Sequence, residues 1–570
     1  MKKGKYVFLI IIIFFLLITA TVFAFLYSSI SRPPEIKPDS YLEIDLAGPV
    51  QDFFAPDLLT ELFVGRRTLS IHELRESIRK AKVDGRIRCL LLRLGYLECD
   101  WAKASEIRDA VLSFRKSGKQ AYAYIEEAPE FDKEYYLASA CDRIILHPLG
   151  WLGVNGVGGW VPFIRDGLEK LGVEAEVEHV EEFKTAYNMF TEKELTPAHR
   201  TMMDAIYDSI FSEYVRAVAE ARKKNEAEVR LIIDTGLYQG QAALDAGLVD
   251  DLLYEDELKT LLQDKGKYLR RARLAEYSRI SPTSLGMETG RKVALIYAMG
   301  PIMSGEGGYQ VIGGRTLARW IRRAREDRSV AAVVLRVDSP GGSAVASDVI
   351  WREIFLAKKE KPVVVSMSDV AGSGGYWISM AAHKIVAQPQ TLTGSIGVLA
   401  GKFNLVGLYK KLGITAEKMT RGRRADMFST FRPLTPEEKR FLKEQILWTY
   451  DQFLSKVAEG RGLTKEAVNE IGRGRVWTGQ QAREIKLVDE LGGLDRALEL
   501  AKSLAGIPAQ EDVRLVVWPK RTSIFSLIFG RTEAKARLTG SAGIDKLIPA
   551  LRVLEKENPW ALMPFWLPTQ

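Results

Sequence analysis

The chain has 570 residues, 46% hydrophobic and 27% charged, which excludes a disordered or collagen-like protein and predicts more than one domain. Lysine and arginine number 81 against 73 aspartate and glutamate, and this surplus of 8 forms no basic stripe, so a nucleic-acid-binding protein is disfavoured. An odd number of cysteines without zinc-site spacing excludes a disulfide scaffold. We expect isolated buried thiols at Cys89, Cys99 and Cys141.

The amino end resembles a membrane anchor. A basic stretch, residues 1–5, precedes an uncharged apolar run that is long enough for a transmembrane helix at about 6–29. Because the lysines come first, we expect a cytoplasmic amino end and a catalytic bulk on the extracytoplasmic side of a bacterial-type cytoplasmic membrane. A cleaved secretory signal is the alternative, since residues 20–24 resemble a cleavage site. Residues 30–40 would link the anchor to the body.

The body contains an internal duplication. Three blocks recur in the same order at offsets of 241 (389 − 148) or 239 (436 − 197) residues: 135–148 at 376–389, 195–197 at 434–436, and 248–250 at 487–489. This regular spacing predicts two homologous domains. The expected division is an N-terminal repeat at 41–265, a linker at 266–292, a C-terminal repeat at 293–506 and a tail at 507–570.

The tail has no recognisable counterpart in the first half of the chain. It contains an apolar patch at 524–529 and an aromatic end at 559–566. Such a segment would contact a membrane surface, a partner subunit or the body of the protein, and the sequence does not distinguish these three.

Short apolar segments alternate with amphipathic ones in the second copy. Strands are predicted at 293–297, 330–337 and 363–366, and helices at 316–326 and 346–358. Strand–helix–strand order predicts an α/β body with a largely parallel sheet.

Two glycine-rich corners follow strands of the second copy. The first, residues 338–343, contains Gly341 and Gly342, whose exposed backbone N–H groups suit an oxyanion, although a plain tight turn is the alternative. The second places Ser373 among three glycines where a helix begins, which suits an accessible nucleophile. Helix capping is the other common use of a serine in that position.

A nucleophilic serine needs a base. The five histidines form no triad pattern, and His383 would stand some 15 Å beyond Ser373 along a helix. A buried lysine is the remaining type of base, because burial makes a neutral amine available near neutral pH.

These motifs resemble the signal peptide peptidase A family, in its long, tandem-repeat, membrane-anchored form. The matching segments are 182–186, 338–343, 372–379 and 391–397, and the resemblance covers about residues 1–506. It implies a serine endopeptidase in which Ser373 is the nucleophile and Lys184 is the general base. The backbone of Gly341, Gly342 and Gly374 would bind the oxyanion, and Ser395 would support Lys184.

The repeats complement one another at these positions. Ser373 corresponds to Asp132 at offset 241, and Lys184 corresponds to Arg423 at offset 239. Arginine does not readily lose its proton, so it is no base. Each copy therefore retains one half of the dyad, and we expect one composite site per chain.

The resemblance also implies tandem domains of the Clp protease/crotonase fold, a homotetramer, and membrane lipid contact through the amino-terminal helix. The substrates would be remnant signal peptides and other unstructured apolar peptides. No metal, ATP or other cofactor is implied. Two alternatives are a crotonase-like acyl-CoA enzyme, which the acidic pair Asp132 and Glu134 keeps open, and an inactive membrane assembly scaffold.

Overall fold

The computed structural model describes residues 34–53, 68–128, 131–264, 266–308, 310–519 and 560–562, with the isolated positions 14 and 21. The predicted anchor at 6–29 thus lies outside the described residues, those two positions apart. No helix within the described ranges is both long enough and apolar enough to cross a bilayer.

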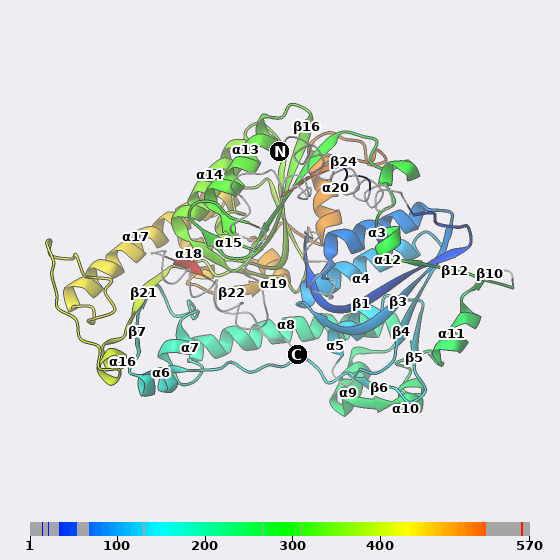
Figure 1. The fold of residues 1–570 in the computed structure, drawn as a ribbon, viewed down its shortest axis with the longest axis horizontal. Coiled ribbons are helices and arrows are strands. Elements are labelled where there is room, and N and C mark those ends of the chain that lie inside the picture. Colours follow the sequence, from blue (N-terminus) through cyan, green and yellow to red (C-terminus); the bar gives the residue numbers. More distant parts are fainter. Residues whose placement is uncertain are drawn as a thin grey trace, which may run out of the picture.

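Two sheets with the same strand order form the body (Figure 1). The first runs in the order β12 (Arg270–Arg273), β1 (Ser40–Gln51), β3 (Ile87–Glu98), β4 (Gln120–Ile125), β5 (Arg143–Leu146), β9 (Asp251–Leu252). The second runs in the order β24 (Arg514–Trp518), β13 (Lys292–Met299), β16 (Val330–Ser339), β18 (Val363–Gly372), β19 (Lys384–Ala387), β23 (Glu490–Leu491). Every neighbouring pair in both series is parallel. The predicted α/β class and the duplication are confirmed.

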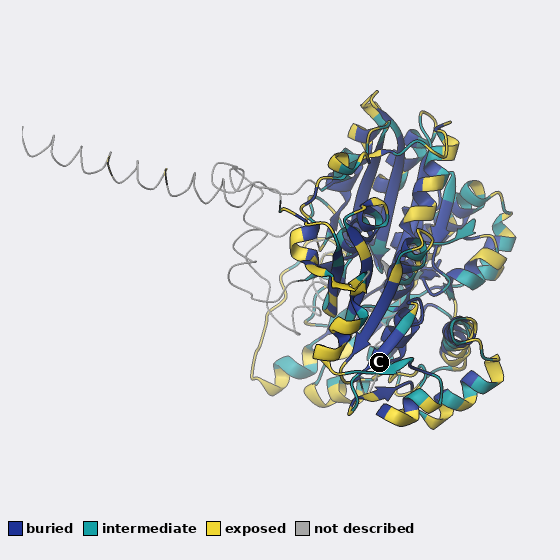
Figure 2. Ribbon diagram, turned by 90° about the vertical axis from the view of Figure 1, so that its right-hand side faces the viewer, coloured by how far each residue is buried: buried dark blue, intermediate teal, exposed yellow. Residues whose placement is uncertain are grey.

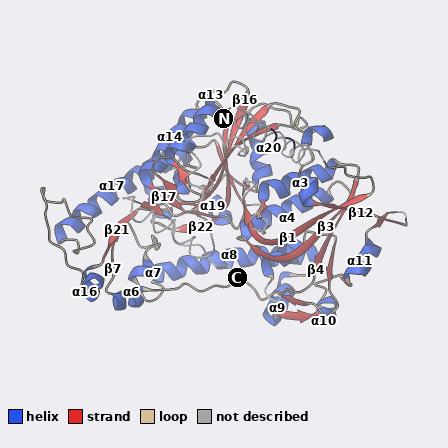
Figure 3. Cartoon of the chain, viewed as in Figure 1, coloured by secondary structure: helices blue, strands red, loops and turns tan. Residues whose placement is uncertain are grey.

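Helices cover both faces of the second sheet, as buried parallel strands require (Figures 2 and 3). In the second repeat, α13 (Gly314–Glu326) and α14 (Ala344–Lys358) pack on one face, and α20 (Leu494–Leu504) packs on the other. Successive strand residues point to opposite faces, so Val333 faces α13 and α14 while Val334 faces α20. The strands and helices predicted for the second copy are confirmed.

The predicted linker and tail both contribute strands to the sheets, which differs from the sequence-based division. The strand β12 lies within 266–292 and pairs with β1, and β24 lies within 507–570 and pairs with β13. The two strands are equivalent edge strands, so the tail does have a counterpart in the first half. The pattern is hard to detect because β12 reads Arg-Arg-Ala-Arg, with one buried residue, Ala272.

Two long helices and a strand pair connect the repeats. Both α8 (Pro197–Arg222) and α17 (Pro436–Arg461) have 26 residues and begin after a capping threonine, Thr196 or Thr435, at the predicted offset. Strand β7 (Glu174–His179) of the first repeat pairs antiparallel with β21 (Leu399–Asn404) of the second. This pair is visible at the lower left of Figure 1, and it brings the loop after β7 into the second repeat.

Candidate active site

Ser373 stands at a strained corner between β18 and the short helix α15 (Gly374–Trp377). Its backbone has φ 55° and ψ −112°, a conformation that non-glycine residues rarely adopt. Ser373 occupies the N-cap position of α15 but makes no capping hydrogen bond with its side chain, so the capping alternative is wrong. The side chain remains oriented for another use.

The two glycine corners pack directly against each other. A Cβ on Gly374 would lie 3.0 Å from Gly341 Cα, and one on Gly375 would lie 2.6 Å from the Ser339 carbonyl oxygen. Glycine is therefore required in the Ser373 corner because another backbone approaches it. The contact brings residues 341 and 342 beside the nucleophile corner.

The first corner forms the strand β17 (Gly341–Ser343). Gly341 has φ 100° and Gly342 has φ 152°. Any side chain on Gly342 would also lie 2.0 Å from the Ile302 carbonyl oxygen. The Gly341 N–H donates to Ser339 Oγ at 3.2 Å, so this predicted oxyanion donor already has an acceptor.

Lys184 of the first repeat reaches Ser373 of the second. Its Nζ lies 2.8 Å from Ser373 Oγ, 3.0 Å from Ser395 Oγ and 3.1 Å from the Ser395 carbonyl oxygen. All three residues are fully buried. The structure thus brings the predicted nucleophile, base and supporting serine together in one chain.

Burial lowers the pKa of the Lys184 amine well below its usual range, and no charged neighbour opposes this shift. A neutral amine has two hydrogens to donate and one lone pair. The two Ser395 oxygens match the donors, which leaves the lone pair for the Ser373 hydroxyl proton. This arrangement suits a general base at neutral pH.

The loop that carries Lys184 is clamped by the second repeat. The Val180 N–H donates to the Val398 carbonyl at 3.1 Å, and the Phe183 N–H donates to the Arg473 carbonyl at 3.2 Å. A Cβ on Gly474, whose φ is 83°, would lie 2.4 Å from the Lys184 nitrogen. Gly474 therefore allows this loop to pack closely, and no motif in the sequence distinguishes it from an ordinary turn glycine.

Ser395 has its own constrained backbone. Its φ is 48°, and its N–H donates to the Arg475 carbonyl at 2.7 Å. The same residue thus offers two oxygens to Lys184 from a fixed position.

A second inter-repeat lysine, Lys103 on α4 (Trp101–Arg115), bridges Asp338, which begins the first corner, and Asp369, which precedes the second. Its Nζ lies 2.7 Å from Asp338 and 2.7 Å from Asp369. Burial alone would lower the pKa of this amine, but the two carboxylates outweigh burial and raise it well above its usual range, so Lys103 stays charged. The sequence points to Lys103 only indirectly. An aspartate near the end of a buried strand needs a positive charge beside it, but nothing in the sequence says which residue supplies that charge.

The corresponding corner of the first repeat is filled by side chains. The Asp132 carboxylate accepts from the N–H groups of Asn155 at 3.1 Å and Gly156 at 2.9 Å. Glu134 accepts from the Leu97 N–H at 2.7 Å, and Lys133 Nζ donates to the Cys99 carbonyl at 2.8 Å.

The counterpart of Lys184 is on the surface. Arg423 has 80% of its side chain exposed and pairs with Glu437 at 2.6 Å. Together with the filled corner of the first repeat, this placement agrees with the prediction of one composite site per chain.

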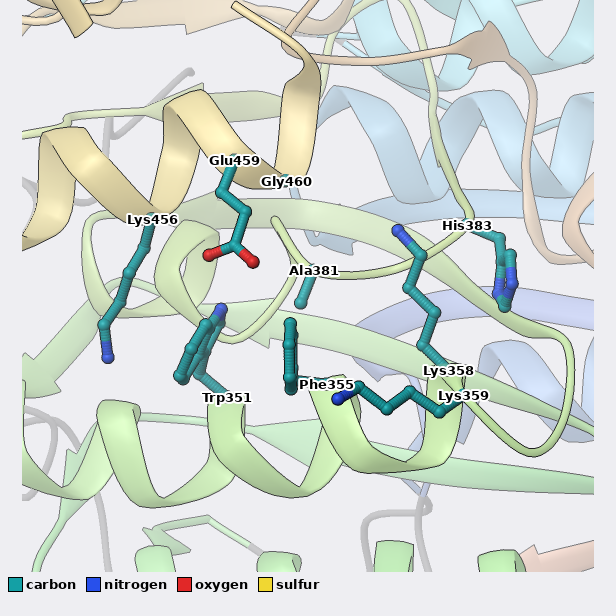
Figure 4. A pocket seen from close by; sticks show the side chains of 9 residues that line it. All are labelled: Trp351, Phe355, Lys358, Lys359, Ala381, His383, Lys456, Glu459 and Gly460. Carbon is teal, nitrogen blue, oxygen red and sulfur yellow. The ribbon is translucent and has the colours of Figure 1, made fainter.

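The histidines are engaged elsewhere. His383 accepts from the Val363 N–H at 3.1 Å and lines a separate pocket of about 330 Å³ with Trp351, Phe355 and Lys456 (Figure 4). The other four contact Tyr297 (His72), the Leu149 N–H (His147), the Glu181 carbonyl (His179) and the Phe163 ring (His199). None of these contacts involves Ser373, which agrees with a lysine base.

Cys89, Cys99 and Cys141 are free, Cys99 is only partly buried by surface area, and burial raises the pKa of the Cys89 thiol to about 12. In the parts of the chain that the structure describes, no three His, Cys, Asp or Glu side chains are grouped to hold a metal ion.

The profile of peptidase family S49 matches residues 113–269 and 356–508, one segment in each repeat. The chain belongs to this family. The S49 peptidase is 37% identical over 459 residues to the chloroplastic serine protease SPPA of Arabidopsis thaliana, with 79% of this chain and 68% of the relative covered. It is 32% identical over 498 residues to Protease 4 of Salmonella typhi, with 84% and 79% covered.

Among solved structures, a ClpP1 mutant from Listeria monocytogenes matches with a TM-score of 0.24 and 15% identity, over 36% of this chain and 94% of that one. The family membership makes this S49 peptidase a serine protease. Membership of a serine protease family disfavours both alternatives from the sequence analysis, the crotonase-like acyl-CoA enzyme and the inactive membrane assembly scaffold.

Proposed function

We propose that this S49 peptidase is an endopeptidase with a Ser373–Lys184 dyad assembled from its two repeats. The observation that carries the proposal is the 2.8 Å separation of Lys184 Nζ and Ser373 Oγ in a fully buried position. The low pKa of this lysine and the strained serine backbone both agree with an activated nucleophile.

The reaction proceeds in two halves. Lys184 Nζ takes the proton from Ser373 Oγ, which attacks the scissile carbonyl carbon, and the lysinium then gives that proton to the leaving amine. The resulting acyl-enzyme is cleaved by water, whose proton Lys184 accepts, and Ser373 is regenerated as the acid product leaves.

Two backbone N–H groups would hold the oxyanion. Gly374 is the first residue of α15, so its N–H has no partner within that helix. Gly342 lies beside it, whereas Gly341 already donates to Ser339. We therefore assign the role to Gly342 and Gly374, and each donor would stabilise the transition state by roughly 2.7–4 kcal/mol.

Substrates are proposed to be unstructured apolar peptides, chiefly remnant signal peptides, met at the membrane by an enzyme anchored through residues 6–29. The resemblance supports this substrate class, and the apolar run of that segment supports the anchor. A homotetramer is proposed as well. Its support is the exposure of three large side chains, Trp160 at 86%, Met419 at 90% and Trp448 at 65%.

The test uses the full chain in detergent. We expect it to cleave a synthetic signal-peptide sequence while leaving a folded protein uncut, as mass spectrometry of the products would show. A serine-reactive probe should label the wild type at Ser373 and leave Ser373→Ala unlabelled. Labelling that persists in Ser373→Ala, or an absence of peptide cleavage, would overturn the proposal.

A further inference from the structure

A segment from the far end of the chain lies as a strand beside the active site. Strand β25 (Trp560–Leu562) stands between β17 and β21 in a sheet ordered β15-β14-β17-β25-β21-β7, where β14 is Ile302–Met303 and β15 is Ile312–Gly313. It pairs antiparallel with β17, residues 341, 342 and 343 opposite 562, 561 and 560. It also pairs antiparallel with β21, Leu399 opposite Trp560.

Both strands that flank β25 lead to the reacting groups. On one side, a Cβ on Gly374 would lie 3.0 Å from Gly341 Cα and 3.1 Å from the Gly342 nitrogen. On the other side, β21 follows Gly397, whose carbonyl oxygen lies 3.5 Å from Ser373 Oγ. A strand in this slot therefore runs along the two backbone segments that surround the nucleophile.

The slot has the properties of a peptide-binding groove. It is one strand wide, and each wall offers the backbone edge of a strand, so an extended peptide can bind through main-chain hydrogen bonds of β-sheet type. The absence of side chains at Gly341 and Gly342 leaves that edge open to a second backbone. An extended chain of any suitable sequence would take the path that β25 takes.

We propose that the C-terminal segment around Trp560–Leu562 is a resident ligand of the substrate groove, bound as a strand in the place of a peptide substrate and competing with it. This inference rests on the proposed function, because it takes the slot beside Ser373 to be the groove in which substrates bind. Because the segment is covalently attached, its binding is intramolecular, and modest intrinsic affinity is sufficient for it to compete with free peptides.

The first test weakens the strand without shortening the chain. Proline lacks an N–H group and is not accommodated in a strand paired on both sides, so Ala561→Pro should release the segment. We expect the KM for a peptide substrate to fall several-fold and kcat to stay unchanged. Ala542→Pro, the same substitution elsewhere in the tail, is the matched control. Equal KM values in the two variants would overturn the proposal.

The second test measures binding without catalysis. A fluorescent peptide of residues 556–570 should bind saturably to the full chain carrying Ser373→Ala and Ala561→Pro, and at least tenfold more weakly to Ser373→Ala alone, where the tail occupies the groove. The same peptide with Ala561→Pro is the control and should not bind. Absence of saturable binding to the double variant would overturn the proposal. If the double variant binds the peptide but the wild-type chain cleaves no peptide, the inference about the tail is supported and the proposed function is wrong.

Discussion

The two corners at Asp132 and Ser373 occupy equivalent places in the two repeats, yet they are built in opposite ways. In the first repeat, Asp132, Lys133 and Glu134 fill the corner and bind backbone groups. In the second, Ser373 is followed by glycines that admit the backbone of residues 339–342. One fold thus supports a packed corner or a reactive one, depending on whether side chains or backbone occupy the space.

Replacing the lysine that reaches each corner, Lys184 at Ser373 and Lys133 beside Asp132, is the strongest test of this comparison. Lys184→Met should lower kcat by about 10²–10⁴-fold, because the proposed general base is lost. Lys133→Met should leave kcat within about twofold, because Lys133 bonds to a carbonyl in the packed corner. Steady-state peptide hydrolysis measures both, and equal losses would show that the first corner also takes part in catalysis.

The bridging lysine tests how the reactive corner is positioned. Lys103→Met removes the cation between Asp338 and Asp369, and a displacement of about 1 Å in the corners would cost roughly 10²-fold in kcat with little change in KM.

The loss of kcat in Lys103→Met must be distinguished from the loss of stability that unpaired charges cause. Lys103→Met leaves the buried Asp369 carboxylate and the partly buried Asp338 carboxylate without their cation, so it should also destabilise the fold by about 3–5 kcal/mol. Adding Asp338→Asn and Asp369→Asn should restore the melting temperature but not kcat. Recovery of kcat together with stability would reduce Lys103 to a structural role.

Ser395→Ala should have a smaller effect, about five- to tenfold on kcat, from the loss of one hydrogen bond to Lys184. The Ser395 hydroxyl stabilises the ammonium form, so its loss should lower the pKa of Lys184 further. Activity rises with pH as this amine loses its proton, and the acidic limb of the pH–rate profile should therefore move to lower pH. Ser395→Gly, which also lacks the hydroxyl and tolerates the positive φ of this position, should move the limb by the same amount, and an unmoved limb in both variants would remove Ser395 from the site.

Asp132→Ala should affect stability alone. Its activity should stay within about twofold of wild type, while the unpaired N–H groups of Asn155 and Gly156 cost about 1–3 kcal/mol. Burial raises the pKa of the Asp132 carboxyl from 3.8 to about 6, so its contribution to stability is largest below pH 3.8 and declines as pH rises through about 6.

Thermal unfolding at pH 4 and pH 8 measures this effect. The destabilisation caused by Asp132→Ala should be greater at pH 4 than at pH 8. The opposite order would mean that Asp132 is held as a stabilised carboxylate.

The sequence predicts the parts of this molecule that have a local signature. Apolar strands, amphipathic helices, the recurring blocks and both glycine corners follow from composition and spacing, and the residues around Ser373 follow from the family resemblance. The edge strand β12 escapes prediction because its Arg-Arg-Ala-Arg sequence has no apolar pattern, and without β12 the equivalence of β24 cannot be recognised. The sequence also does not predict the contacts of Lys103 and Gly474 or the pairing of β7 with β21. In each case the partners lie more than 200 residues apart along the chain.

The clamp around Lys184 links chemistry to the completion of synthesis. Lys184 and Ser373 are 189 residues apart, and Gly474 is translated later still. Before those segments close over it, the amine is hydrated, keeps an ordinary pKa near 10.4 and carries a proton at neutral pH. On the proposed mechanism, the dyad therefore forms only when the chain has folded around this amine.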